Sequence, residues 1–138
     1  MSEQNETELF RQNKKAAENG DGKAMNNLAI CYDNGKGTEK NLKKAFYWYQ
    51  KAVEKGHVNA MTCLAGCYYN GEGVEKNLEK AFYWYQKAAE NGNEDAMNRL
   101  ANGYYNGEGI KKNLLKAFYW YQKAAENGNE DAMNSSRK

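Results

Sequence analysis

The sequence predicts an all-α protein, a right-handed α-solenoid of stacked antiparallel helical hairpins with a period of 36 residues. Three observations lead to this fold class. The first is exact recurrence at that period, seen at Ala24, Ala60, Ala96 and Ala132. The second is that each unit contains two helical patterns of apolar residues. The third is that the 138 residues include no proline, which helix interiors exclude. A single hairpin cannot bury its apolar stripe, so the units are expected to stack.

The first helix of each unit, which we call the A helix, is expected at about residues 23–33 in the first unit. Ala24, Leu28 and Tyr32 follow one another at intervals of four and share one helical face. The stretch NGKG comes next. Glycine adopts the left-handed conformation that commonly ends a helix, so the A helix is expected to stop there.

The second helix of each unit, which we call the B helix, is expected at about residues 41–55. Its apolar stripe consists of Leu42, Ala45, Phe46, Tyr49, Ala52 and Val53. Asparagine is a good N-cap and glycine is common just beyond a helix end. Those positions are held by Asn41, Asn77 and Asn113, and by Gly56, Gly92 and Gly128. Asp21, Asn93 and Asn129 are expected to cap the A helices, whereas His57 is expected to cap poorly.

These elements predict a single solenoid over residues 1–138. Residues 1–20 form a lone B helix. The full repeats are 21–56, 57–92 and 93–128, and residues 129–138 form a truncated A helix.

The segment KAFYWYQKA occurs three times without a change and raises the question of an aromatic ligand cage. Phe46 and Tyr49 lie on the apolar stripe and are expected in the core, with Trp48 at its flank. Tyr47 points away from the stripe and is expected to be exposed. Consecutive helical residues diverge by about 100°, so their rings cannot converge on one cation. The block is therefore interpreted as mainly structural.

Composition narrows the class of protein. The 20 basic and 18 acidic side chains give a net charge of +2, which argues against a nucleic-acid-binding protein. An aromatic fraction of 13% argues against disorder. No apolar run reaches the ~18 residues of a membrane span, and the polar N-terminus has no signal-peptide pattern. Three cysteines, an odd number in helical patterns, favour reduced thiols and an intracellular place, either cytoplasmic or nuclear.

No constellation for catalysis is found, so no enzyme, cofactor or metal is expected. The G-x-G loops lack the lysine and the preceding strand of phosphate-binding motifs. His57 is the one histidine, with no ligand spacing around it. No serine, cysteine or lysine is paired with a base.

The second unit reads A-x3-L-A-x2-Y-x2-G-x-G-x3-N-x2-K-A-x2-W-Y-x-K-A-x3-G from Ala60 to Gly92. This pattern resembles the Sel-one-like repeat (SLR), a branch of the tetratricopeptide-like solenoids, over roughly residues 9–134. Alanine replaces the family's usual glycine after leucine at Ala65, and Asn77 replaces its usual aspartate. Neither departure threatens the fold. The resemblance implies a non-enzymatic adaptor that holds complexes together through a curved surface, whose concave side is lined by the A helices.

The A helices vary where the rest of the repeat does not. Residues 77–98 and 113–134 differ only at Glu79 and Leu115. The variable positions on the A helices are expected to contact a protein or peptide partner, and they are Asn27, Ile30, Asp33, Cys63, Gly66, Tyr69, Arg99, Asn102 and Tyr105. Tyr69, Arg99 and Tyr105 are the preferred hot spots, because tyrosine and arginine dominate interface energetics.

Three alternatives stay open. The variation could be neutral drift at exposed sites. The chain could be a structural module that self-associates end to end, since neither end carries an obvious cap. An RNA-reading helical repeat is a further alternative, which the near-neutral charge and the lack of a basic stripe disfavour.

Overall fold

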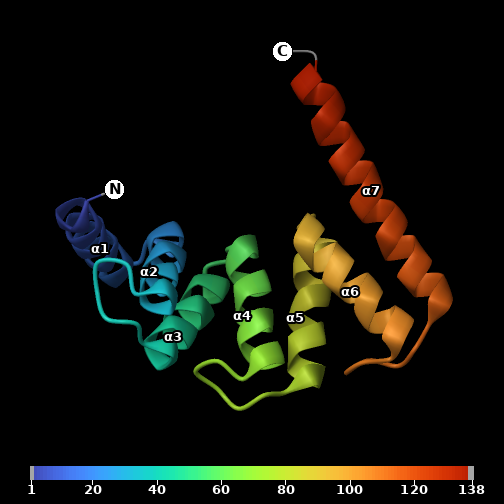
Figure 1. Cartoon of the computed structure of the whole chain (residues 1–138), viewed down its shortest axis with the longest axis horizontal. Coiled ribbons are helices and arrows are strands. Elements are labelled where there is room, and N and C mark those ends of the chain that lie inside the picture. Colours follow the sequence, from blue (N-terminus) through green and yellow to red (C-terminus); the bar gives the residue numbers. More distant parts are fainter. Residues whose placement is uncertain (1, 137–138) are drawn as a thin grey trace.

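The computed structural model describes residues 2–136, with side chains described for residue 2 and residues 4–128. This part of the chain contains helices and no strand, and the all-α prediction is confirmed. The helices are α1 (Glu3–Glu18), α2 (Gly22–Asn34), α3 (Leu42–Glu54), α4 (Val58–Asn70), α5 (Leu78–Glu90), α6 (Glu94–Asn106) and α7 (Leu114–Ser136). B helices (α1, α3, α5, α7) alternate with A helices (α2, α4, α6), and each helix packs against its neighbours in sequence (Figure 1).

Five of the six predicted aspartate and asparagine caps begin helices, namely Asp21, Asn41, Asn77, Asn93 and Asn113, whereas Asn129 lies inside α7. Asn41 Oδ1 accepts the N–H of Lys44 at 3.1 Å at the start of α3. His57, expected to cap poorly, is a working cap of α4, because its Nδ1 accepts the N–H of Ala60 at 3.3 Å. A neutral imidazole offers one nitrogen acceptor, which suffices for one of the free N–H groups at a helix start.

The G-x-G turn both ends the A helix and brings consecutive units into contact. Gly71 has φ of 69° and forms the left-handed C-cap of α4. Gly73 has φ of 75°, and a Cβ there would lie 2.1 Å from the carbonyl oxygen of Leu42 on α3. The turn can therefore approach the preceding B helix only with glycine at this position.

The core follows the predicted stripes. Leu28, Leu64 and Leu100 are its largest fully buried side chains. Tyr49 is buried, as expected, whereas Phe46 is half-buried and meets the ring of Tyr68 edge-on at 5.4 Å. Tyr47 is 49% exposed, in agreement with the prediction.

The last helix departs from the predicted organisation. We expected Gly128 to end the B helix and residues 129–138 to begin a separate A helix. Instead, α7 runs without a break from Leu114 to Ser136 and extends away from the stack (Figure 1). In the other units the A helix packs against the B helix that follows it. Within residues 2–136 no such helix follows α7, so no tertiary contact stabilises a bend, and the continuous helix keeps its hydrogen bonds.

Among the described helices, none combines the length and the apolar character that crossing a membrane requires.

Candidate interaction groove on the A helices

The nine predicted contact residues all lie on α2, α4 and α6. We call the surface that they mark the A-face. Beneath it lies a row of B-helix residues at one repeat position, namely Asn13, Tyr49, Tyr85 and Tyr121. Three of the nine predicted residues hydrogen-bond to this row, which therefore belongs to the A-face although sequence reasoning assigned Tyr49 to the core alone.

Two tyrosines of the row are hydrogen-bonded to the A helix of their own unit. The Tyr49 hydroxyl donates to the Asp33 carboxylate at 3.1 Å. The Tyr121 hydroxyl donates to Asn102 Oδ1. Tyr85 faces Gly66, which has no side chain that could accept a hydrogen bond. A Cβ atom placed on Gly66 would lie 4.0 Å from the Tyr85 hydroxyl oxygen. Burial raises the pKa of Tyr49 and Tyr85, so both hydroxyls stay protonated donors at neutral pH.

A hollow of about 210 Å³ opens beside Tyr85, between α4, α5 and α6. Its lining residues are Tyr69, Phe82, Tyr85, Arg99, Asn102, Gly103, Asn106 and Glu108. Three of the predicted contact residues, Tyr69, Arg99 and Asn102, thus meet at one place. The structure therefore brings together part of the predicted set around a concavity.

Glu108 was not predicted, because it lies in the G-x-G turn of the third unit. The Tyr69 hydroxyl donates to its Oε1 at 2.5 Å, across 39 positions of sequence. This hydrogen bond is the main reason why the pKa of Tyr69 is raised. It ties α4 to the turn after α6 and holds the Glu108 carboxylate at one wall of the hollow.

Phe82 forms the apolar wall because the repeat changes at Gly103. The equivalent phenylalanine of the previous unit packs edge-on against Tyr68, whereas Phe82 packs against Tyr69 and Tyr85, with ring centroids 6.1 and 5.5 Å apart. A Cβ at Gly103 would lie 2.3 Å from the Phe82 ring. The signal was present in the sequence, since cysteine occupies the position of Gly103 in the first two units.

The other predicted residues lie apart from the hollow. Asn27 donates to Asn13 Oδ1 at 3.5 Å, and Ile30 is half-buried against the core. Cys63 is half-buried beside Tyr49, and burial raises the pKa of its thiol. Tyr105 is 49% exposed on the same helix as Arg99. Asn27, Ile30 and Cys63 are half-buried and thus less available to a partner than expected, whereas Tyr105 is exposed.

The three thiols are free, and each is a poor nucleophile. Cys31 and Cys67 are buried, and burial raises both pKa values, that of Cys67 to about 12. A thiol needs its thiolate form to react, so these cysteines stay inert near neutral pH. Within the described side chains, no group of three or more metal-ligating residues is found.

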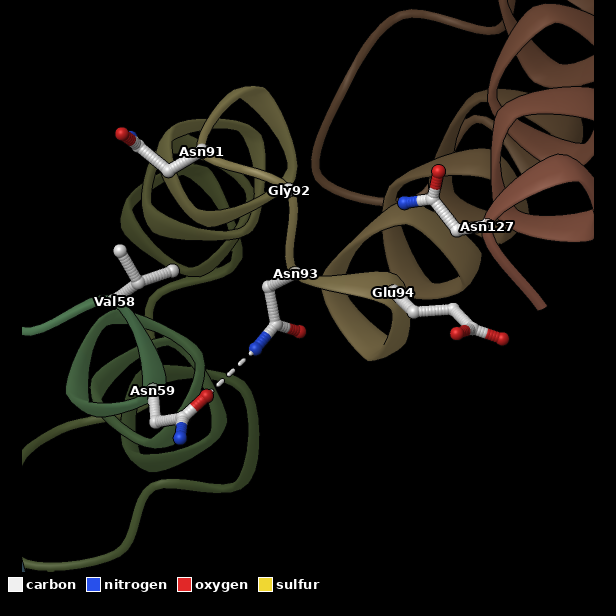
Figure 2. Close-up of a pocket in the computed structure, with 7 residues that line it drawn as sticks. All are labelled: Val58, Asn59, Asn91, Gly92, Asn93, Glu94 and Asn127. Carbon is white, nitrogen blue, oxygen red and sulfur yellow. Dashed lines mark hydrogen bonds between the residues drawn. The ribbon is translucent and has the colours of Figure 1, made fainter. Parts of the chain in front are cut away.

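A second, larger hollow of about 580 Å³ lies where the turns between units meet (Figure 2). Its lining is mostly asparagine, and Asn93 Nδ2 donates to Asn59 Oδ1 at 3.1 Å across it. Asn93 also caps α6 by accepting the N–H of Ala96 at 2.9 Å. Both polar groups of the Asn93 side chain are therefore used within the fold, and this hollow is a junction between units.

Comparison with known proteins shows which family has this architecture. The family model described as Sel1 repeat matches residues 22–57, 58–93 and 94–129. A protective antigen of uropathogenic Escherichia coli strains, which displays an SLR fold, is 37% identical with a TM-score of 0.83, over 86% of this chain and 26% of that one. A Sel1 repeat protein from Oxalobacter formigenes is 36% identical with a TM-score of 0.83, over 92% of this chain and 51% of that one.

The Helicobacter pylori cysteine rich protein B is 31% identical with a TM-score of 0.69, over 91% of this chain and 95% of that one. The chain thus spans about a quarter of the first of these structures and half of the second. Comparison with curated proteins gave no significant match. The three matched repeats cover most of the sequence, and the chain belongs to the Sel1 repeat family.

Proposed function

We propose that the protein is a non-enzymatic interaction scaffold, an adaptor that binds a peptide or a protein partner on its A-face. The family is in general one of protein-interaction modules. The observation that carries the proposal is the convergence of Tyr69, Arg99 and Asn102 around one hollow. These positions vary between units that are otherwise nearly identical. Binding would use neutral tyrosine donors and one arginine, a combination typical of interface hot spots.

The test is affinity capture from an extract of the native cell, with three baits compared. The first is the native chain, and the second carries Tyr69, Arg99 and Tyr105 replaced by alanine. The third is a matched control in which the exposed tyrosines of the B helices, Tyr47, Tyr83 and Tyr119, are replaced by alanine. We expect partners to be retained by the first and third baits and lost from the second. Each A-face hot spot should contribute about 2 kcal/mol or more to binding.

Thermal melting by circular dichroism must show that all three baits are folded. If the A-face variant captures the same proteins as the native chain, the proposal is wrong. If partners are lost from the B-helix variant alone, the binding surface lies on the opposite side of the hairpins.

A second candidate function is self-association through the outer face of α7. Phe118 is 58% exposed, whereas the equivalent Phe82 is 3% exposed beneath α6. Leu114 and Leu115 extend this apolar face, at 44% and 83% exposure. A second copy, packing the same face of its own α7 against it, would cover these side chains. Molecular mass measured across a range of concentrations tests this candidate, and a constant monomer mass would exclude it.

A further inference from the structure

The hollow beside Tyr85 is the place where the repeat symmetry of the A-face is broken. In the first and third units, the hydroxyl of the row tyrosine donates to Asp33 or Asn102. In the second unit Gly66 stands at the position of Asn102, and no side chain fills the space. The two acceptors come from two different repeat positions, which in the second unit are held by Tyr69 and Gly66, and neither of these is bonded to Tyr85.

Tyr85 is left with a donor that the fold does not use. The residue is 3% exposed, yet among the side chains that the structure describes its hydroxyl has no hydrogen-bond acceptor. The hydroxyl instead lines the hollow together with Arg99. In the described part of the chain, the fully buried side-chain atoms without a hydrogen bond are Asn26 Oδ1 and Thr62 Oγ1, so the Tyr85 hydroxyl is not sealed in the core and can be reached from the hollow. An acceptor group that enters the hollow would therefore meet an available hydroxyl donor.

Arg99 provides the charge at the same place. Its side chain is exposed, and the ion pairs formed by the described side chains, Arg11–Glu8 and Lys51–Glu54, do not include it. Its positive charge reaches the Tyr85 hydroxyl and lowers the pKa that burial raises. A guanidinium without a partner presents a planar set of donors that matches a carboxylate.

Size and charge restrict what can enter. The hollow, at about 210 Å³, is smaller than the ~300–1,000 Å³ typical of small-molecule sites, so it fits one side chain. Phe82 offers an apolar wall for the methylene groups of such a side chain. Glu108, held by Tyr69, adds one negative charge to the same lining. The lining holds one cation and one anion, so a singly charged carboxylate can pair with Arg99, whereas a doubly charged phosphate would bring a second charge that no cation of the lining neutralises.

We propose that this hollow is a carboxylate-binding subsite of the A-face, which takes a single acidic group of the partner. Arg99 and the Tyr85 hydroxyl donate to the carboxylate, and Phe82 packs against its stem. The acidic group is either an aspartate or glutamate side chain or a chain terminus. The inference rests on the proposed function, because it names the chemistry of the partner at the centre of the same surface.

The test is a titration of the labelled full chain with four small probes, followed by NMR. N-Acetylglutamate α-amide carries a side-chain carboxylate, and N-acetylglutamine carries a terminal one. N-Acetylglutamine amide has no charge, and N-acetylphosphoserine amide carries a phosphate. We expect one or both carboxylate probes to shift the Arg99 side-chain N–H and the amides of Gly66 and Tyr69 in a saturable way. The neutral and phosphate probes should not.

Two variants locate the subsite. Gly66→Asn gives Tyr85 the acceptor that the third unit has, and its Cβ would make only an ordinary contact. Tyr85→Phe removes the donor. Each should weaken carboxylate binding by roughly tenfold, the value of a hydrogen bond to a charged group. Glu108→Gln should strengthen binding, because it removes the opposing charge.

The inference is overturned if the neutral probe causes the same shifts, if the phosphate probe binds more tightly than the carboxylates, or if Gly66→Asn leaves binding unchanged. These failures are separable from failure of the proposed function. If partner capture depends on the A-face but the carboxylate probes do not bind, the scaffold proposal stands and the carboxylate subsite is wrong. If the carboxylate probes bind but partner capture does not depend on the A-face, the carboxylate site stands and the scaffold proposal is wrong.

Discussion

Gly73 joins the second hairpin to the helix before it, and Gly73→Ala tests how the units are held together. Its φ of 75° costs a non-glycine residue about 1–2 kcal/mol. The new Cβ would also lie 2.1 Å from the carbonyl oxygen of Leu42, a backbone atom that cannot simply rotate away. The hairpins would have to move apart, and such overpacking costs a further ~1–3 kcal/mol. Gly73→Ala should therefore lower the free energy of unfolding by about 2–5 kcal/mol.

Gly71→Ala is the matched control, because it changes the same turn at nearly the same backbone angle. Gly71 has φ of 69°, but a Cβ there would lie 3.4 Å from its nearest neighbours on Lys76. Only the backbone cost of about 1–2 kcal/mol is expected. Urea denaturation followed by circular dichroism measures both variants. Equal destabilisation by the two would refute the reasoning that the second glycine allows the units to approach each other.

Three other predictions concern the core, the thiols and the free face of α7. Leu64→Ala should lower the free energy of unfolding by about 2–5 kcal/mol in the same urea assay, because Leu64 is 2% exposed and its loss leaves a cavity. Stability should fall as the pH rises from 9.0 towards about 12, because unfolded Cys67 loses a proton that the folded thiol keeps. Denaturation at several pH values should show a smaller fall for Cys67→Ala. Leu115→Glu, which restores the residue type of Glu79, should reduce any concentration-dependent rise in mass seen by light scattering.

Much of the fold could be predicted from the sequence because each unit repeats the same local signals. The caps, the apolar stripes and the glycines recur at a fixed interval, so a helix boundary predicted in one unit is also correct in the next. The prediction of a helix end failed at Gly128, where the local sequence is the same as at Gly92 but the tertiary context differs. No B helix follows within the described residues to pack against a new A helix, and α7 continues to Ser136.

The A-face could be predicted only in part. Variation between units identified Tyr69, Arg99 and Asn102, which line the hollow. It could not identify Tyr85, because this tyrosine is the same in every full unit and is distinguished only by what stands opposite it. The contribution of Glu108 depends on a hydrogen bond across 39 positions, which no local pattern reveals.

Site-specific photo-crosslinking to the captured partner tests most directly whether the A-face is the binding surface. Two tyrosines form a matched pair, since Tyr105 on the A-face is 49% exposed and Tyr83 on α5 is 54% exposed. Each would be replaced in turn by a photoreactive phenylalanine derivative. If the A-face is the binding surface, position 105 should give a crosslink and position 83 none. A crosslink from position 83 alone would show that the partner binds elsewhere.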